Sequence, residues 1–323
     1  MSEVLATSSV LGARERRDHA LARLGYRRME HRVTPGLYSL GRPDRSSPVF
    51  VSANYTLSFD ALRSALHGMG AYILVLDTKG INVWCAAGKG TFGTDELVDR
   101  IEATSLIEHV DHRRLILPQL GAPGVSAHDV KARTGFSVEY GPVRAGDLPE
   151  YLGAGATEEM RRVTFPLRDR AVLIPVELRN IAIETVVVFA VLFILGGIVP
   201  ALIALTAALA GAALFPLLLP VLPTKDFTSK GMLLGAAVSL PFVLYYATTV
   251  PGWMGLAYAA GTVLLVVPVV GYLALNFTGC STYASRTGVK EEIFRYIPMI
   301  VAMAIIGLAI IVATVVGSTL GWF

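Results

Sequence analysis

The sequence predicts an α/β domain with a mainly parallel sheet, followed by an all-α membrane domain of five transmembrane helices. Of the 323 residues, 53% are hydrophobic and only 16% are charged, which is too apolar for an ordinary soluble protein. Nearly all of the charge lies before residue 180, and long apolar tracts follow. In the first half, strand-like runs alternate with helical patterns, which is typical of a parallel sheet with helices on both faces.

The uneven charge predicts four segments. They are a basic N-terminal arm at 1–35, a cytoplasmic α/β domain at 36–160, a basic connector at 161–180 and the five-helix membrane domain at 181–323. The arginine-rich arm fits a solvated helix face better than an amphipathic helix on anionic lipid. Nucleic-acid binding is not supported, because no aromatic platform or recognised motif accompanies the arginines.

Turn residues at Pro35–Tyr38 precede the predicted fold. We then expect strands at 48–53, 72–76, 115–117 and 136–140. The expected helix caps are Ser58, Asn82, Thr94 and Ser126, and the glycines at 88 and 90 stop the second helix. The loops 52–58, 77–90, 118–126 and 141–147 all follow strands. They should converge beyond the carboxyl ends of the sheet, where α/β domains bind ligands.

Cys85 is the candidate functional residue in these loops. Behind the Asn82 cap it falls in the first helical turn, where backbone amides and the helix dipole favour a thiolate. The alternative is a small cysteine buried in the core. A hydrolase would need a nearby histidine base, and only His128 lies, marginally, in a converging loop. A soft thiolate also suits a soft metal, including the cobalt of a corrinoid.

The second half contains five apolar tracts, each about the ~20 residues needed to cross a bilayer. They are 181–199, 201–222, 232–249, 254–275 and 297–320. The basic residues between them fall in the loops 223–230 and 276–296, and the basic connector precedes them. Positive loops stay inside, so we expect the α/β domain in the cytoplasm and the C-terminus outside. Two cysteines, Cys85 and Cys280, agree with a reducing compartment.

The stretch Asn82-Val83-Trp84-Cys85-Ala86-Ala87-Gly88-Lys89 resembles the signature of the HgcA family, the membrane-bound corrinoid proteins of microbial mercury methylation. The corrinoid domain of that family is related to the large subunit of the corrinoid iron-sulfur protein. Further similar segments follow in the same order. They are 53–55, 57–60, 117–120, 122–125, 140–145 and 276–282. The resemblance covers roughly residues 36–323.

The resemblance implies a Rossmann-like corrinoid-binding domain with a cap helix. It implies a base-off corrinoid with Cys85 as the lower axial cobalt ligand, and a methyl group transferred as a carbanion equivalent to Hg(II), forming methylmercury. The Asp-x-His-x-x-Gly motif that supplies a histidine ligand in many corrinoid proteins is absent. The expected corrinoid contacts are Asn82, Val83, Trp84, Cys85, Ala86, Ser52, Ser58 and Ala145. Turn and cap chemistry is the other interpretation of these residues, and Trp84 also suits packing of the cap helix.

The resemblance also implies a ferredoxin-like partner with two [4Fe-4S] clusters as reductant, and a methyl donor from a methyltetrahydrofolate pathway. Cys280 fits either a thiolate relay for Hg(II) or an ordinary cysteine at the membrane interface. Two other functions stay open. One is a corrinoid methyl carrier for another metal or C1 acceptor, and the other is a membrane sensor or transporter with an α/β ligand domain.

Overall fold

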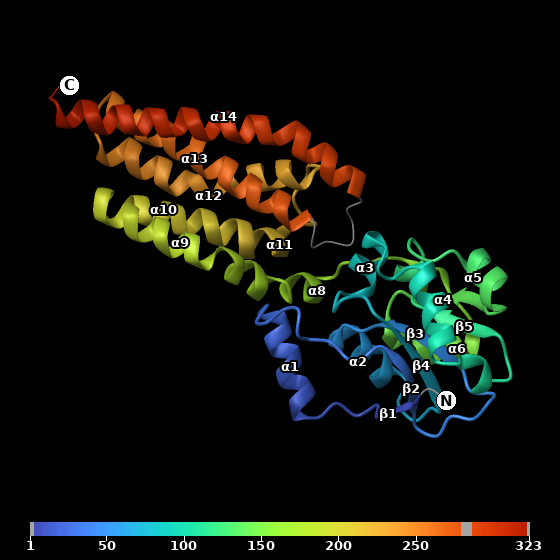
Figure 1. The fold of residues 1–323 in the computed structure, drawn as a ribbon. Coiled ribbons are helices and arrows are strands. Elements are labelled where there is room, and N and C mark those ends of the chain that lie inside the picture. Colours follow the sequence, from blue (N-terminus) through green and yellow to red (C-terminus); the bar gives the residue numbers. More distant parts are fainter. Residues whose placement is uncertain (1–2, 279–285, 322–323) are drawn as a thin grey trace. The chain divides into compact units, whose positions relative to one another are not determined.

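The computed structural model describes residues 3–278 and 286–321, and it divides into two compact units (Figure 1). Unit 1 comprises Met1–Val163 and unit 2 comprises Thr164–Phe323. Unit 1 combines strands and helices, whereas the described part of unit 2 is helical. Each unit has its own buried apolar clusters, so each has a core of its own.

Unit 1 is built on a six-stranded sheet in the order β1-β2-β4-β3-β5-β6. The strands are β1 (Leu5–Thr7), β2 (Gly36–Leu40), β3 (Val49–Ala53), β4 (Ala71–Leu76), β5 (Arg114–Leu117) and β6 (Ser137–Tyr140). β3 pairs in parallel with β4 and β5, and β5 pairs in parallel with β6. The carboxyl ends of these four strands therefore lie at one edge. This confirms the predicted mainly parallel α/β sheet.

Helices cover both faces of this sheet (Figure 1). They are α1 (Ala13–Arg23), α2 (Thr56–Ala65), α3 (Val83–Lys89), α4 (Thr94–Ala103), α5 (Ala127–Thr134), α6 (Leu148–Ala154) and α7 (Glu158–Arg161), with the 3-10 turns η1 (Leu106–Glu108), η2 (Gln119–Gly121) and η3 (Ala145–Asp147). Leu74 and Leu76 of β4 pack in one core with α3, α4 and α5. Ile73 and Val75 pack in the other with α2 and α6. The period of two along the strand thus fills both faces.

Two of the predicted caps are confirmed. The Asn82 side chain accepts a hydrogen bond from the Cys85 amide at the start of α3, and Ser126 accepts one from Asp129 at the start of α5. Gly90 and Gly135 end these helices in the left-handed conformation that glycine adopts without steric cost. Gly88 lies inside α3, so it does not stop the helix as predicted.

The other two predicted caps are wrong. α2 begins at Thr56, and Ser58 lies inside its first turn, because the Thr56 amide donates to the His31 carbonyl oxygen from a neighbouring segment. Gly93 occupies the cap position of α4. A Cβ atom there would lie 2.7 Å from the Gly90 carbonyl oxygen, so the chain is too close for a capping side chain. Thr94 instead accepts a hydrogen bond from the Ser126 amide.

The prediction of turn residues at Pro35–Tyr38 is also wrong over most of its length. Gly36–Leu40 forms β2, which runs antiparallel to β4 with Gly36 opposite Val75. Leu37 and Leu40 are buried, so the strand contributes to both cores. β1, from within the predicted basic arm, adds to the outer side of β2. Glycine and proline at the start of the strand concealed its apolar pattern.

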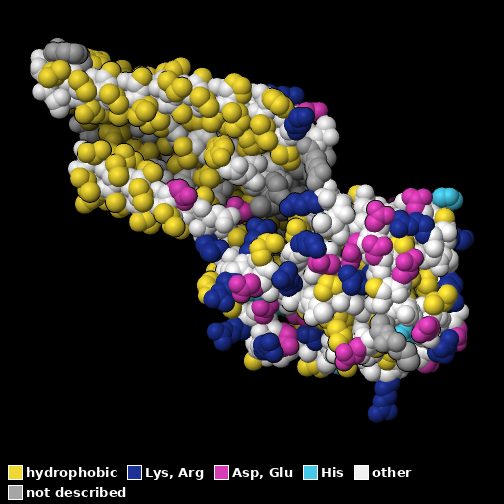
Figure 2. All heavy atoms as spheres, viewed as in Figure 1, with side chains coloured by type: hydrophobic (Ala, Val, Ile, Leu, Met, Phe, Trp, Pro, Cys, Tyr) yellow, Lys and Arg dark blue, Asp and Glu magenta, His cyan; other side chains and the backbone are white. Residues whose placement is uncertain are grey.

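Unit 2 contains long apolar helices whose surface is mainly hydrophobic (Figure 2). They are α8 (Leu167–Ala171), α9 (Ile174–Gly196), α10 (Ile198–Leu209), the π-helical turn η4 (Ala210–Leu214), α11 (Phe215–Leu218), α12 (Phe227–Thr249), α13 (Trp253–Thr278) and α14 (Arg286–Thr319). Four stretches are long and apolar enough to cross a membrane, namely Ile198–Leu218, Phe227–Thr249, Trp253–Thr278 and Thr287–Thr319. The pair Leu167–Asn180 and Ala182–Gly196, bent by 56°, makes a fifth span if counted as one. This agrees with the predicted helical membrane domain.

Charged side chains hold the ends of several unit 2 helices together. The Glu292 carboxylate accepts hydrogen bonds from the Phe227 and Thr228 amides at the start of α12. The buried Arg170 guanidinium donates to the Pro216 and Leu217 carbonyl oxygens at the end of α11. The amides and carbonyls at helix ends have no partners inside the helix, and leaving them unpaired in apolar surroundings is energetically unfavourable. The contacts of Glu292 and Arg170 supply the missing hydrogen bonds.

Candidate functional site

The predicted convergence of loops is present at the carboxyl edge of the sheet. The segments after β3, β4, β5 and β6 all begin at this edge, because the four strands are parallel. α3 follows β4 and carries Cys85, and it contacts both β3 and η2. The cysteine is therefore on an element that lies against the segment after β5 and against the strand β3.

Asn54, the first residue after β3, organises the loop that leads to α3. Its side chain is 1% exposed. The Oδ1 atom accepts hydrogen bonds from the Thr78 amide at 3.1 Å, the Thr78 hydroxyl at 2.9 Å and the Gly80 amide at 3.0 Å. The Nδ2 atom donates to Asp77 Oδ1 at 3.1 Å. One amide thus holds the entire turn between β4 and the cap helix.

Cys85 occupies the third position of α3 and is partly exposed. Its backbone amide donates to Asn82 Oδ1 at 2.9 Å, so the cap fixes the backbone from which the thiol projects. Val83, Ala86 and Ala87 of the same helix are buried in the core. α3 therefore presents Cys85 and Trp84, both partly exposed, while its other side is committed to packing.

Glycines in the segment after β5 let the chain pass close to α3. A Cβ atom at Gly124 would lie 2.1 Å from the Phe92 carbonyl oxygen and 2.9 Å from Ala87 Cα. At Gly121 it would lie 2.6 Å from the Phe92 ring. Contacts this short exclude any side chain, so both glycines are required for α3 and the β5 segment to approach each other.

The remaining predicted contact residues are divided between two places. Ser52 is buried within β3, 3% exposed, rather than in a loop. Ser58 lies in the first turn of α2, and Ala145 starts η3 and packs against the core on the α2 side of the sheet. α2 and η3 contact each other. The structure therefore brings Asn82 to Ala86 together on α3, and it places Ser58 and Ala145 on two elements, α2 and η3, that contact each other.

The sequence interpretation assigned no role to two residues that flank α3. Thr91 Oγ1 and Gln119 Oε1 are buried and have no hydrogen-bond partner among the described residues. Such buried acceptors are uncommon in folded proteins. Thr91 follows the end of α3, and Gln119 opens η2, which contacts α3. Their position next to the cap helix could be recognised only once the fold was known.

A segment before β2 also reaches the carboxyl edge. Arg32 and Tyr55 form an antiparallel backbone bridge, and the Thr56 amide donates to the His31 carbonyl oxygen at 3.0 Å. The buried His31 ring lies between two oxygens, with Nδ1 2.7 Å from Asp18 Oδ1 and Nε2 2.6 Å from the Tyr26 carbonyl oxygen. These contacts tie part of the predicted basic arm to the edge that carries Cys85.

Comparison with known proteins identifies the relatives of unit 1. Residues 27–152 match the CdhD family. The family is described as the delta subunit of CO dehydrogenase/acetyl-CoA synthase. The CdhD match covers the sheet from β2 onward with α3, and it includes the segment around His31. It ends before unit 2, so it describes the α/β part of the chain.

Curated relatives agree with the CdhD match. The chain is 35% identical over 122 residues to the acetyl-CoA decarbonylase/synthase complex subunit gamma of Methanopyrus kandleri, which is 37% of this chain and 26% of that protein. It is 33% identical over 128 residues to the same subunit of Methanothermobacter thermautotrophicus, 39% of this chain and 28% of that protein. The chain thus spans about a quarter of the length of these relatives. Residues 27–152 are thus related to subunits of acetyl-CoA synthase and decarbonylase complexes, which agrees with the predicted relationship to the large subunit of the corrinoid iron-sulfur protein.

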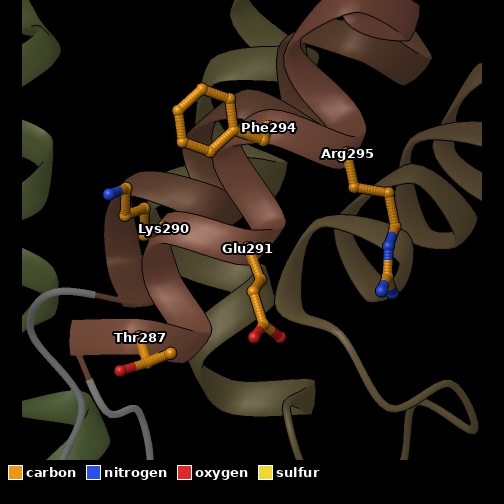
Figure 3. Close-up of a pocket in the computed structure, with 5 residues that line it drawn as sticks. All are labelled: Thr287, Lys290, Glu291, Phe294 and Arg295. Atoms are coloured by element: carbon orange, nitrogen blue, oxygen red, sulfur yellow. The ribbon is translucent and has the colours of Figure 1, made fainter.

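Two other features were considered as sites. Among residues 3–278 and 286–321, no group of three or more His, Cys, Asp and Glu side chains could hold a metal ion. A hollow on α14 is lined by Thr287, Lys290, Glu291, Phe294 and Arg295. Figure 3 shows these side chains spreading around a single helix rather than converging on an enclosed cavity. Cys280, which fits either a thiolate relay or an ordinary cysteine at the membrane interface, lies outside the described residues.

Proposed function

We propose that the protein is a membrane-bound corrinoid methyltransferase that transfers a methyl group to Hg(II), with Cys85 as the lower axial ligand of cobalt. The observation that carries this proposal is the position of Cys85. Cys85 is partly exposed on a capped helix at the carboxyl edge of the sheet. The domain that contains this sheet matches the acetyl-CoA synthase family named above. The apolar helices of unit 2 support membrane attachment.

The residues at this edge fit a corrinoid. A corrin ring supplies four nitrogen ligands to cobalt, so one protein thiolate is sufficient to complete its lower side. Side-chain amides surround the ring, and they can donate hydrogen bonds to acceptors such as Thr91 Oγ1 and Gln119 Oε1, which have no protein partner among the described residues. Both the thiol and the acceptors are carried by α3 or by segments next to it.

In this proposal the chain holds and orients the reactive group. A bound corrinoid supplies a cobalt–carbon bond whose methyl group can be passed to an acceptor. Asn82 fixes the backbone of Cys85, and Asn54 fixes the turn that leads to it. The close approach of Gly124 to Ala87 keeps α3 against the domain. These contacts restrict the backbone from which the sulfur projects, which is what ligand positioning requires.

The acceptor and partners belong to the same proposal. Thiolate is a strong electron donor and favours transfer of the methyl group as a carbanion equivalent, which an electrophile such as Hg(II) accepts. We propose a ferredoxin-like protein with two [4Fe-4S] clusters as the reductant, and a methyl donor from a methyltetrahydrofolate pathway. Ser52, Ser58, Val83, Trp84, Ala86 and Ala145 remain proposed corrinoid contacts.

We also propose the membrane arrangement. Residues 36–160 form the corrinoid-binding domain, with the arm at 1–35 and the connector at 161–180 on the same cytoplasmic side. Residues 181–323 then form the membrane domain with the C-terminus outside. Two of the basic side chains on which this orientation depends are Lys230 and Arg295. Lys230 lies in the first turn of α12, and Arg295 lies one turn after Glu292, the α14 residue that binds the start of α12.

The test is methylmercury formation by cells that express the full chain with its reductant. Cys85→Ala should abolish the product, and Cys280→Ser, which removes the only other cysteine of the sequence, should retain most of it. Purified wild-type protein should bind a corrinoid, seen by its absorption spectrum. Corrinoid binding without methylmercury formation would leave a methyl carrier for another acceptor. Absence of corrinoid binding would refute the proposal as a whole.

A further inference from the structure

Tyr55 lies directly after Asn54, on the edge of the sheet that carries Cys85, and its phenol is partly buried. Burial raises the pKa of Tyr55, while the charges of Arg28 and Arg23 act to lower it and those of Asp18 and Cys85 to raise it. Because charge interactions weaken with distance and with screening, these four groups belong to the wider surroundings of the phenol. Two guanidinium groups and a phenol thus share one neighbourhood with the proposed cobalt ligand.

These groups are available to a ligand. The Tyr55 hydroxyl has no hydrogen-bond partner among the residues that the structure describes. Arg23 and Arg28 are exposed, and within the described ranges neither forms an ion pair. Arg27, the residue next to Arg28, is already paired with Glu30 at 3.3 Å. Arg23, Arg28 and Tyr55 therefore keep donors that no described residue uses.

Backbone contacts hold this neighbourhood in place. Arg32 and Tyr55 form the antiparallel bridge described above. A Cβ atom at Gly80, in the turn before α3, would lie 3.5 Å from the Met29 carbonyl oxygen and 3.6 Å from Arg32 Cβ. The segment 29–32 is therefore packed on the loops after both β3 and β4, and Arg28 precedes it directly.

The local charge is positive. Arg23, Arg28 and Arg32 are exposed, whereas over the unit as a whole Figure 2 shows basic and acidic side chains mixed. The opposing carboxylate is Asp18, whose Oδ1 lies 2.7 Å from His31 Nδ1. The second oxygen of Asp18 is buried without a partner among the described residues. Over residues 18–32, four arginines thus outnumber the two carboxylates, Asp18 and Glu30, and both carboxylates already have a partner.

We propose that Arg23, Arg28 and Tyr55 bind the phosphodiester of the nucleotide tail of the corrinoid. This inference rests on the proposed function. In a base-off corrinoid, Cys85 takes the lower axial position that the base of the tail would otherwise occupy. The tail remains attached on the same lower side, and it carries one negative phosphodiester charge. Guanidinium groups bind phosphate oxygens through paired hydrogen bonds, and a phenol donates one more.

The test compares two corrinoids that differ in this tail. Full-length protein in detergent is titrated with aquacobalamin and with cobinamide, which has the corrin ring but lacks the nucleotide and its phosphodiester. Arg28→Ala should weaken cobalamin binding about tenfold, and Tyr55→Phe about threefold, with little change for cobinamide. Only cobalamin has a nucleotide base that must be displaced from the cobalt. The free energy of this displacement is the same for wild type and variant, so it cancels when the two proteins are compared.

Arg17→Ala is the matched control, because Arg17 is an exposed arginine of α1 that is not among the charges with the largest effect on Tyr55. It should change neither affinity by more than about twofold. Retained cobinamide binding by Arg28→Ala and Tyr55→Phe shows that these variants are folded. Anionic phospholipid vesicles, offered to the same proteins, test a lipid phosphate as the alternative source of the same chemistry.

Three results would overturn the inference. Equal weakening of both corrinoids would mean that the residues support the domain or the ring, not the tail. Unchanged cobalamin binding in Arg28→Ala would exclude a role for this arginine. Loss of vesicle binding with normal cobalamin binding would assign the arginines to lipid. Failure of wild-type protein to bind either corrinoid would instead refute the proposed function.

Discussion

Replacement of Asn54 by alanine should free the turn that delivers Cys85. The side chain is buried and makes four hydrogen bonds with the turn at 77–80. Three of its partners keep another contact. The Thr78 amide retains the Leu76 carbonyl oxygen at 3.1 Å, the Thr78 hydroxyl retains Ile81 at 2.7 Å, and Asp77 Oδ1 retains the Lys79 amide at 3.1 Å. The buried Gly80 amide has no other partner among the described residues.

The magnitude follows from these contacts. An orphaned buried amide costs about 1–3 kcal/mol, and each exchanged hydrogen bond about 0.5–1.5 kcal/mol. The sum is about 3 kcal/mol of local stability, because the three partially compensated bonds contribute at the low end. A loss of about 3 kcal/mol corresponds to amide exchange in the turn that is about 150-fold faster, because each factor of ten in the opening equilibrium is worth about 1.4 kcal/mol.

Hydrogen–deuterium exchange of the full-length protein in detergent measures this directly. Peptides that cover 77–90 should lose protection in Asn54→Ala, with the largest change at the turn. Thr134→Ala is the control, since its hydroxyl donates to the Val130 carbonyl oxygen at the end of α5 and does not contact the turn. Exchange in 77–90 that changes less than about fivefold would refute the assignment of Asn54 as the organiser of this loop.

Other positions give independent tests. Gly124→Ala should lower the free energy of unfolding by about 1–3 kcal/mol, because the added Cβ would meet backbone atoms of Phe92 and Ala87. It should also weaken corrinoid binding, and an unchanged affinity in a titration would contradict this. Asn82→Ala should destabilise α3 by about 1 kcal/mol, seen as faster amide exchange confined to that helix. Burial and the hydrogen bond to Glu139 raise the pKa of Tyr151 from 10.0 to about 12. The protonated phenol therefore contributes to the stability of the folded domain. This contribution to stability is complete below pH 10 and is lost as the pH rises through about 12, so the thermal midpoint should fall less steeply across that range in Tyr151→Phe than in wild type.

Much of the α/β unit could be predicted because local signals and tertiary contacts agree there. Three of the four parallel strands, β3, β4 and β5, are short and mainly apolar runs, and burial on both faces is what such runs require. The Asn82 cap was predictable because the side chain bonds to a backbone amide three residues away, Cys85, and needs no distant partner. The same holds for Ser126 and its partner Asp129.

The features that could not be predicted depend on distant residues. Ser58 has the right type and spacing for a cap, but the Thr56 amide finds its acceptor on His31, 25 positions earlier in the sequence. β2 was concealed by Gly36, and its pairing with β4 is visible only in three dimensions. Asn54 binds a turn more than twenty residues later in the sequence, so its role depends on the folded structure. Gln119 Oε1 is buried without a partner among the described residues, and its burial also depends on residues that are distant in sequence.

The limits of the apolar tracts also differ from those predicted. α9 begins at Ile174, before the first tract, because the pattern of charged residues there remains compatible with a helix. Gly197, which has a positive φ of 81°, separates α9 from α10. This break falls inside the predicted tract 181–199. Hydropathy locates such spans well, whereas their ends depend on helix geometry and on contacts such as those of Arg170.

Cobalt K-edge absorption spectroscopy of the corrinoid-loaded full-length protein tests the central claim most directly. The wild-type spectrum should contain a sulfur atom in the cobalt coordination shell, and Cys85→Ala should lack it while Cys280→Ser retains it. A shell made only of nitrogen and oxygen in the wild type, or a sulfur contribution that persists in Cys85→Ala, would contradict the assignment of Cys85 as the lower ligand.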